Sequence, residues 1–380
     1  MTQRSVRILA TLVAALGLLL EAVPSLAAPI TPLHPVEGLA VDPPPVVTAD
    51  AWILYDETYD LVLASENADE ERSMASTTKI MTGMVAFENS TPEQTVVVSD
   101  NAADVGEAEV PLVAGEELEI GSLTTGLLVR SANDAAIAVA EGVAGSVEGF
   151  VELMNAKADE LGLQHTHFTN PHGLDEPGHY TSATDLLTMA RAAMEIPAFA
   201  RAVGSQVYRF PADPVGEFRV VENTNTLLWD YEGTIGVKTG YTFRAGRCIV
   251  AAAERDGRRI YVVVMGSDEA SDHFADAKAL LDYGFESFGV VPLIVEGQAY
   301  GVRRSGTEVD PLVAAATVEA FVHIAGAGLF APELSLVDGQ PVLVAEGDAQ
   351  LEAPVVPETS SLPSLFDALS WFEHWFGEGA

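Results

Sequence analysis

A serine and a lysine three residues apart are the first feature of this sequence that could do chemistry. They are Ser76 and Lys79, in the run Ser-Thr-Thr-Lys. Residues three apart on a helix lie on one face, about one turn from each other, so the lysine amine would lie within reach of the serine hydroxyl. Burial under that helix would favour the neutral amine, which is the form that a general base needs. The pair therefore predicts a serine nucleophile with its own base.

A second lysine stands in a short run that suits substrate binding. Lysine is scarce in this chain, at four residues against fifteen arginines, yet one of the four opens the run Lys238-Thr239-Gly240. The stretch before it alternates in polarity and the run ends in glycine, which favours a strand whose edge another backbone can approach closely. An extended peptide binds such an edge through main-chain hydrogen bonds. The run therefore predicts a strand that holds the substrate.

A third run pairs a hydroxyl with an amide, which could pass a proton and hold a substrate amide. The pattern Ser-x-Asn occurs three times, at residues 65–67, 99–101 and 131–133. The third occurrence is a polar interruption between two apolar helical segments, where a buried polar loop needs a function, so we assign Ser131 and Asn133 to the site. The second occurrence is closer to an ordinary turn or helix cap, and the first lies on a hairpin before the nucleophile.

The elements that must position these runs follow from the apolar periodicity. Apolar segments at 51–55 and 61–64 flank a polar turn and predict a hairpin that leads into the serine helix. The other predicted elements are a strand at 95–98, helices at 118–129 and 135–143, and strands at 234–240, 247–253 and 260–264. Cys248, the only cysteine, lies in one of these strands, so we expect a buried structural thiol and no intrachain disulfide.

The composition excludes some classes of partner. A formal charge of −37 gives a surface that repels nucleic acid, so we predict no nucleic-acid partner. The eight histidines show no convincing metal-ligand spacing: His165 and His167 would share a strand face, but no third ligand accompanies them. We therefore predict no metal and no cofactor.

The first residues predict export. Arg4 and Arg7 precede an apolar run at 8–20 and a stretch of small residues, so residues 1–27 are typical of a cleaved signal peptide. An uncleaved membrane anchor is the alternative, although thirteen apolar residues are too few for a stable span. Export would place the protein in the periplasm or on the outer face of the cytoplasmic membrane. Residues 28–47 are rich in proline and predict an extended linker.

The C-terminal part is less clearly patterned. Short apolar runs broken by glycine predict a small β-rich domain at 287–352, in which 313–322 fits a helix equally well. Three prolines predict a linker at 353–363. Residues 364–380 form an amphipathic pattern with two tryptophans and no lysine or arginine. This helix either lies on a membrane surface through apolar burial or docks onto the protein itself or onto a partner.

Taken in order, Ser76-Thr-Thr-Lys79, Ser131-Ala-Asn133 and Lys238-Thr-Gly240 resemble the signature of the penicillin-binding serine D-alanyl-D-alanine carboxypeptidases. The resemblance covers residues 48–286, which we expect to be the serine DD-peptidase catalytic domain. It implies an α/β (α+β) fold, with a β-lactamase/transpeptidase-like domain whose antiparallel sheet is flanked by helices, plus the small β-rich C-terminal domain. It also implies removal of the terminal D-alanine from peptidoglycan stem pentapeptides through an acyl-enzyme on Ser76, and inhibition by β-lactams.

The resemblance assigns a role to each site residue. Lys79 takes the nucleophile's proton, Ser131 returns it to the leaving amine, Asn133 holds the substrate amide, and Lys238 supplies positive potential near the substrate carboxylate. Thr239 and Gly240 belong to the substrate-binding strand, and the N–H group of Tyr241 joins that of Ser76 in an oxyanion hole.

One position departs from the family pattern. The family usually has an arginine for the substrate carboxylate where this chain has His273, a weaker and pH-dependent anchor. Thr239 with Arg244 or Arg247 would be a substitute, or recognition of the carboxylate is loose enough for an endopeptidase.

Three other functions remain alternatives: a DD-endopeptidase, a serine β-lactamase and a non-catalytic peptidoglycan-binding protein. The best-known β-lactamases carry a Glu-x-x-Leu-Asn loop, and no such string stands between Ser131 and Lys238. A decayed, non-catalytic site should break at least one of the three motifs, whereas all three are intact.

Overall fold

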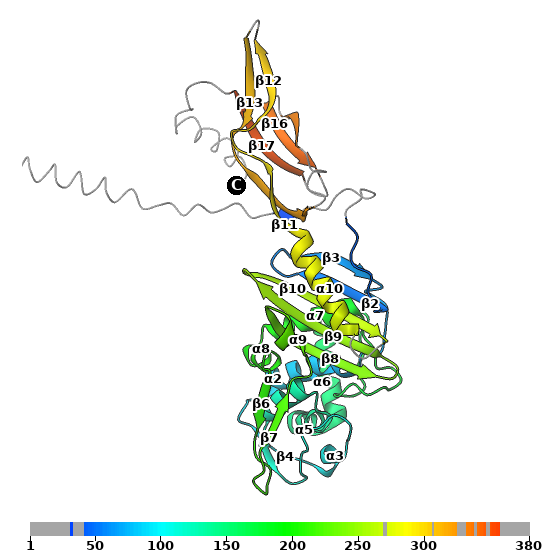
Figure 1. Cartoon of the computed structure of the whole chain (residues 1–380). Coiled ribbons are helices and arrows are strands. Elements are labelled where there is room, and N and C mark those ends of the chain that lie inside the picture. The colour runs from blue at the N-terminus through cyan, green and yellow to red at the C-terminus, as the bar shows by residue number, and fades with distance from the viewer. Residues whose placement is uncertain are drawn as a thin grey trace, which may run out of the picture.

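The computed structural model describes most of the chain between residues 31 and 357. The described ranges are 31–32, 42–268, 272–305, 308–324, 332–337, 340–346 and 350–357. The predicted signal peptide and the predicted helix at 364–380 lie outside the described residues. Figure 1 shows a larger body of helices and sheet below, and a smaller body of strands above it. Within the described ranges, no helix combines the length and the apolar content that a membrane span requires.

An antiparallel sheet of five strands forms the centre of the larger body. Its order is β3-β2-β10-β9-β8, so β8 lies at one edge. The strands are β2 Ala51–Asp56, β3 Leu61–Glu66, β8 Thr234–Thr242, β9 Gly246–Arg255 and β10 Arg258–Ser267. The hairpin and the three later strands predicted from the sequence are therefore confirmed. Cys248 is fully buried in β9, as a structural thiol should be.

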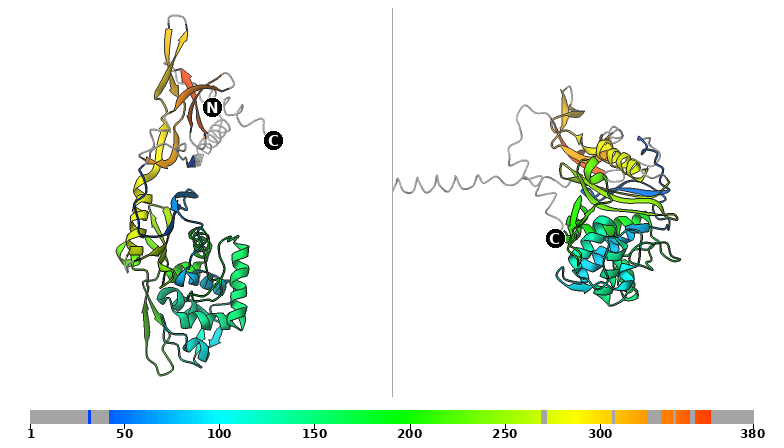
Figure 2. Two further views of the ribbon diagram at one scale, coloured as in Figure 1. Left: turned by 90° about the vertical axis from the view of Figure 1, so that its right-hand side faces the viewer. Right: turned by 60° about the horizontal axis from the view of Figure 1, so that its bottom comes forward.

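Helices cover both faces of this sheet (Figure 2). One face packs on α10 Asp272–Ser287 through residues such as Ile249, Ile260 and Leu280. The other face packs Val250, Tyr261 and their neighbours into the larger apolar cluster. The helices of that cluster are α2 Lys79–Asn89, α4 Ile120–Arg130, α5 Asn133–Ala144, α6 Val147–Glu160, α7 Ala183–Met194 and α8 Pro197–Val203. Alternate strand residues thus face different helical layers, which confirms the predicted fold class.

Short elements complete the larger body. They are the 3₁₀-helix η1 Ala75–Thr78, the helices α3 Asp100–Ala103 and α9 Leu227–Asp230, and the ribbons β4 Thr95–Val97 with β5 Glu117–Glu119 and β6 Val207–Phe210 with β7 Arg219–Glu222. The side chain of Ser99 accepts a hydrogen bond from the Ala102 N–H group at 3.0 Å and so caps α3. This second Ser-x-Asn run is therefore a helix cap, as the sequence predicted.

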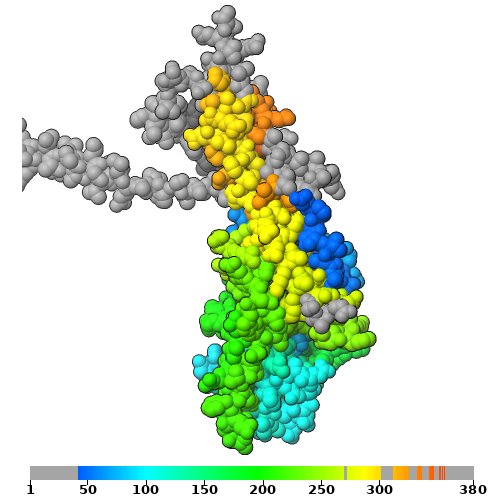
Figure 3. Space-filling model, viewed as in Figure 1, coloured from blue at the N-terminus to red at the C-terminus, as the bar shows by residue number. Residues whose placement is uncertain are grey.

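The C-terminal part consists of strands. They are β11 Phe288–Ile294, β12 Ala299–Ser305, β13 Glu308–Ala314, β14 Val318–His323, β15 Glu333–Val337, β16 Gln340–Glu346 and β17 Gln350–Pro357. Five of them form a sheet of order β12-β13-β17-β16-β15. β14 pairs with β11 and, in parallel, with the two-residue strand β1 Thr31–Pro32. In the space-filling view, the yellow surface of α10 continues into that of β11 (Figure 3).

Two predictions for this region were wrong in part. Residues 313–322 belong to β13 and β14 and to the turn between them, so the helical alternative is excluded. Residues 353–357 form the end of β17 rather than the start of a linker. Their prolines suggested a linker, but Ala353 and Val355 are buried in one apolar cluster with residues of β11, β13 and β16, and this alternation fixes a strand.

Candidate active site

The residue predicted as nucleophile lies on a tight turn. Ser76 is the second residue of η1, which leads directly into α2, and not the first residue of the α-helix itself. Ala75 before it has a left-handed backbone, with φ of 48°, a conformation that is uncommon for a residue other than glycine. The hydroxyls of Thr77 and Thr78 donate to the carbonyls of Met74 and Ala75, at 2.6 and 2.8 Å, and stabilise this turn.

Lys79 lies fully buried beneath the nucleophile. Its Nζ is 2.9 Å from Ser76 Oγ, 2.8 Å from Asn133 Oδ1 and 2.6 Å from the carbonyl oxygen of His172. Burial, and next the charge of Lys238, hold the pKa of Lys79 well below its ordinary value. A neutral amine has two N–H groups and one lone pair. Because the amide and carbonyl oxygens can only accept, they take the two protons and leave the lone pair for the Ser76 hydroxyl.

Ser131 and Asn133 lie where two helices meet. Ser131 ends α4 in a left-handed conformation, with φ of 65°, and Asn133 is the first residue of α5. The side-chain amide of Asn133 donates to the Gly106 carbonyl at 3.2 Å, which turns its oxygen toward Lys79. The buried carboxylate of Asp134 accepts from the N–H groups of Val110 and Leu112, so it fixes the loop that precedes the motif.

Lys238 extends from β8 to the same cluster. Its Nζ donates to Ser131 Oγ at 2.9 Å and to the carbonyl of Thr239 at 2.8 Å. Burial lowers the pKa of Lys238 to about 7. Because the Ser131 oxygen accepts from Lys238, its own proton is free to be donated elsewhere. Two lysines thus join the three predicted motifs. Lys79 connects the first motif to the second through Asn133, and Lys238 connects the third motif to the second through Ser131.

The edge of β8 approaches the nucleophile at Gly240. A side chain added at this glycine would place its Cβ 2.8 Å from the Ser76 nitrogen and 3.0 Å from the Thr77 nitrogen. Only glycine therefore lets the strand lie against the turn. Next along the strand, Tyr241 is half exposed, and the guanidinium of Arg247 stacks over its ring at 3.9 Å. Thr239 Oγ1 donates to Thr224 Oγ1 at 2.7 Å.

One element of the site was missed by sequence reasoning: the loop at 170–174. Its His172 carbonyl accepts from Lys79. Its Gly173 has φ of 91°, and a Cβ there would lie 2.0 Å from the Ala75 oxygen, so only glycine fits this position. The ring of His172 is buried, which lowers its pKa to about 3. The run Asn-Pro-His-Gly is typical of a turn, but a backbone carbonyl can come from any residue type, so no pattern marked this one.

A second buried histidine supports the nucleophile turn. His179 Nε2 lies 2.8 Å from Thr78 Oγ1, and its Nδ1 accepts from the Thr169 N–H group at 3.0 Å. Since Nδ1 accepts, the proton of the neutral ring is on Nε2, where it meets the Thr78 oxygen. Burial lowers the pKa of His179 to about 4, so the ring stays neutral at the pH where the site would work.

His273, predicted to bind the substrate carboxylate, lies in the first turn of α10. The residue is buried, and among the described residues its Nδ1 has no hydrogen-bond partner. Its ring packs on Phe274, with the ring centroids 4.0 Å apart. Burial, and next the charge of Arg247, lower the pKa of His273 to about 4. A neutral, buried imidazole carries no charge with which to attract a carboxylate.

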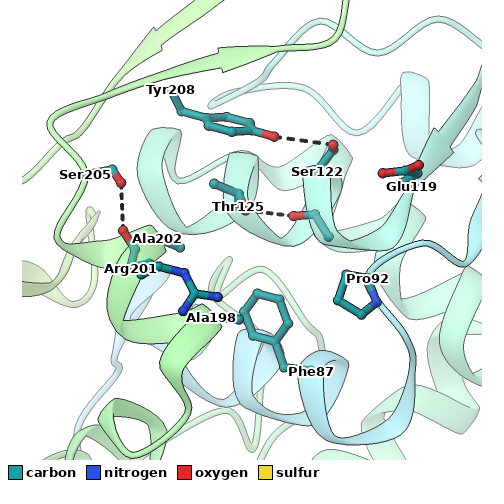
Figure 4. A pocket seen from close by; sticks show the side chains of 11 residues that line it. Phe87, Pro92, Glu119, Ser122, Thr125, Ala198, Arg201, Ala202, Ser205 and Tyr208 are labelled. Atoms are coloured by element: carbon teal, nitrogen blue, oxygen red, sulfur yellow. Dashed lines mark hydrogen bonds between the residues drawn. The ribbon is translucent and has the colours of Figure 1, made fainter.

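A pocket of about 380 Å³ lies outside this cluster, between α2, α4, α8 and β6. Figure 4 shows its lining, with the Tyr208 hydroxyl 3.3 Å from Ser122 Oγ and the Arg201 side chain on the opposite wall. None of the predicted site residues lines it. Within the described part of the chain, no group of three or more His, Cys, Asp or Glu side chains is placed to hold a metal ion.

A buried Ser–Lys pair beside the edge of an antiparallel sheet defines a class of serine enzymes that work through acyl intermediates. Residues 39–269 match the family model of the D-alanyl-D-alanine carboxypeptidases, peptidase family S11, and the chain therefore belongs to this family. The resemblance stated from the sequence is confirmed.

Relatives and solved structures agree with this family. D-alanyl-D-alanine carboxypeptidase DacD of Escherichia coli is 35% identical over 275 residues, 69% of each chain. DacA of the same organism is 30% identical over 369 residues, 88% of this chain and 90% of DacA. A Streptomyces DD-transpeptidase superposes with a TM-score of 0.61 at 31% identity, over 64% of this chain and 99% of that one. DacD of Francisella tularensis shares the fold over 89% of this chain and 98% of its own, with a TM-score of 0.64 at 24% identity.

Proposed function

We propose that this chain is a serine-type D-alanyl-D-alanine carboxypeptidase that removes the terminal D-alanine from peptidoglycan stem peptides. The observation that carries the proposal is the contact of 2.9 Å between Lys79 Nζ and Ser76 Oγ, within a chain that belongs to the carboxypeptidase family. Its curated relatives in Escherichia coli bear the same activity in their names.

Acylation follows from the contacts of the buried lysine. Ser76 Oγ attacks the carbonyl carbon between the two D-alanines while its proton passes to the lone pair of neutral Lys79. The negative charge that forms on the carbonyl oxygen is stabilised by the N–H groups of Ser76 and Tyr241, since Gly240 allows β8 to lie against the nucleophile turn. The substrate backbone lies along the free edge of β8, and Asn133 holds its amide.

Release of the two products completes the cycle. As the C–N bond breaks, the leaving amine takes a proton from Ser131, whose oxygen is held by Lys238 at 2.9 Å, and Ser131 regains a proton from the ammonium of Lys79. Water then attacks the ester on Ser76 and gives a proton to the neutral Lys79, which passes it to the Ser76 oxygen as the stem peptide leaves with a new carboxylate. β-Lactams present a strained amide to the same atoms and acylate Ser76. We assign the enzyme to the exterior of the cytoplasmic membrane, in contact with the membrane surface through residues 364–380.

A β-lactamase is less well supported. The closest string to the Glu-x-x-Leu-Asn motif, at 152–155, lies within helix α6. Asn155 there is engaged with the backbone of Phe168, to which it donates at 2.9 Å and from which it accepts at 2.9 Å. This segment therefore has a structural role, and between Ser131 and Lys238, a stretch that the structure describes in full, no loop carries the Glu-x-x-Leu-Asn string.

The proposal is tested by mass spectrometry of the intact protein and of its proteolytic peptides after treatment with benzylpenicillin. The wild-type protein should gain one drug mass on the peptide that contains Ser76, and Ser76→Ala should gain none. Release of D-alanine from a peptide ending in D-Ala-D-Ala should fall about 10²- to 10⁴-fold in Ser131→Ala, because a positioned proton donor is lost. Ser99→Ala, in the alternative Ser-x-Asn run, is the matched control and should leave the rate unchanged.

Three outcomes would contradict the proposal. Fast and complete turnover of nitrocefin would favour a β-lactamase. Absence of both acylation and D-alanine release would favour a binding protein. Preferential cleavage of cross-linked dimers would favour an endopeptidase.

A further inference from the structure

Arg247 is a partly buried cation in a strongly acidic protein. The chain carries 56 acidic residues against 19 basic ones, so most cations can find a carboxylate. The Nε of Arg247 is nevertheless buried without a hydrogen-bond partner among the described residues. A buried donor that stays unpaired costs free energy, which a bound ligand would recover. Arg247 thus has the properties of an anion-binding group.

The position of Arg247 places it next to the substrate-binding strand. In the pairing of β8 with β9, Arg247 lies opposite Tyr241, and Ile249 lies opposite Thr239. Ile249 belongs to the apolar cluster under α10, and side chains two apart on a strand share a face, so Arg247 lies on the α10 side. Thr239 and Tyr241 share that face with it. The guanidinium is therefore on the same side of β8 as the threonine of the Lys-Thr-Gly motif.

Stacking on Tyr241 prepares the guanidinium for a planar anion. The guanidinium carbon of Arg247, Cζ, lies 3.9 Å from the centre of the Tyr241 ring, within the range of a cation–π contact. Such a contact uses the face of the guanidinium and leaves its N–H edges free. Those edges match the two oxygens of a carboxylate.

The other cations near the site are poorer candidates. Lys238 is already hydrogen-bonded to Ser131 and to a backbone carbonyl. His273 is buried and neutral, and the charge of Arg247 itself contributes to that. Arg244 is exposed in the loop between β8 and β9. A carboxypeptidase must nevertheless distinguish a terminal residue, with its free carboxylate, from an internal one.

We infer that Arg247, supplied by β9 and stacked on Tyr241, binds the free carboxylate of the departing residue. The inference rests on the proposed function and names the residue that makes the enzyme a carboxypeptidase rather than an endopeptidase. It replaces the contact that the sequence assigned to His273.

The test uses two thioesters that differ only at the carboxylate. One is an acyl-D-alanyl thioester of thioglycolic acid, and the other is its methyl ester, so both release a thiol that a colorimetric reagent detects. Wild-type kcat/KM should be at least about tenfold higher for the acid, because a charge-assisted contact is lost in the ester. Arg247→Ala should lower the value for the acid about 10- to 100-fold and leave the ester within about twofold. Arg247→Lys should keep part of the preference.

The matched control is Arg244→Ala, which removes the same charge from an exposed neighbouring position and should leave both substrates unchanged. Equal losses for acid and ester in Arg247→Ala would indicate a structural role and overturn the inference. A wild-type protein that is acylated by benzylpenicillin on Ser76 but shows no preference for the acid would also overturn it, while leaving the proposed function intact. If benzylpenicillin does not acylate the wild-type protein at all, both the inference and the proposed function are contradicted.

Discussion

The proposed proton transfer depends on one amine, that of Lys79, which must be neutral. The two N–H groups of neutral Lys79 donate to Asn133 and to the His172 carbonyl. Only the lone pair of the amine is then left to accept the proton of the Ser76 hydroxyl. Burial contributes most to the neutral state, and the neighbouring charge of Lys238 contributes next. The two lysines are therefore linked electrostatically, and a change at one should be visible in the titration of the other.

Lys238→Ala should shift the pH profile of acylation. Removing a like charge makes the charged form of Lys79 less unfavourable, so the pKa of Lys79 rises. The base is active only above its pKa, and the acidic limb of the profile should therefore move to higher pH. The measurement is the acylation rate against pH with the thioester methyl ester, which has no carboxylate to lose contact with Lys238.

Lys278→Ala is the control for this shift, since that lysine pairs with Asp230 on the surface. Its profile should coincide with that of the wild type. A lower rate in Lys238→Ala with an unmoved limb would mean that the two lysines are not coupled.

The sequence predicted the side chains of the site because their chemistry is visible in short motifs. Ser76, Lys79 and Asn133 meet in one hydrogen-bond network, as the motif order suggested. It could not predict the His172 carbonyl, which lies some ninety residues away and depends on a loop conformation rather than on a side chain. The choice between Arg244, Arg247 and His273 also required the fold, because burial and stacking decide which of them can carry a charge to the substrate.

At the scale of elements, the decisive contact is that of β8 with η1. Gly240→Ala should bring a methyl group 2.8 Å from the Ser76 nitrogen, which is closer than real Cβ contacts come, so the strand or the turn must move. Because displacements of about an ångström in a site reduce rates on the order of 100-fold, we expect a loss of that size in acylation. The acylation rate of Ser76 and the melting temperature are the two measurements.

Gly257→Ala separates the effect on the site from the cost of replacing any glycine. Gly257 lies in the turn between β9 and β10, with φ of 78° and no atom within 4 Å of an added Cβ. This variant should lose some stability and keep the acylation rate. If Gly240→Ala behaves in the same way, then close approach of β8 is not needed for catalysis.

Element prediction succeeded where a short apolar run was unbroken, as in β2 and β10, whose side chains are buried on both faces of the sheet. It failed where one residue type is compatible with two kinds of structure. The prolines at 354 and 357 suggested a linker, yet both lie in β17, where Pro354 pairs with Val342. The sequence also could not predict the 3₁₀ geometry of η1, because the cap-type residues of the motif fit the first turn of an α-helix as well.

At the scale of the whole molecule, the catalytic part and the strands beyond residue 287 share a core. Phe321 of β14 and Phe288 of β11 belong to the same buried cluster as Trp52 and Leu54 of the central sheet. Phe321 also stacks on Tyr59, with their ring centroids 3.9 Å apart. The sequence suggested two units divided at 286/287, but a contact between residues so distant along the chain leaves no local pattern.

Phe321→Ala should therefore destabilise the catalytic part, although the residue lies far from Ser76 in sequence. Deleting a fully buried phenylalanine side chain costs about 3–5 kcal/mol, and here the cavity would open against the central sheet. The measurement is the temperature at which the protein loses its capacity for acylation at Ser76 by benzylpenicillin, which reports on the catalytic part alone.

Leu343→Ala is the matched control for this coupling, because Leu343 is equally buried but lies in the separate apolar cluster formed by β11, β13, β16 and β17. If the distal sheet can lose stability on its own, Leu343→Ala should leave the temperature of acylation loss nearly unchanged, whereas Phe321→Ala should lower it. Equal decreases would mean that the whole chain unfolds as one cooperative unit, and no decrease in Phe321→Ala would mean that β14 contributes nothing to the stability of the site. The shared core thus predicts that truncation at 286 would weaken the enzyme even though every residue proposed to act in catalysis precedes that position.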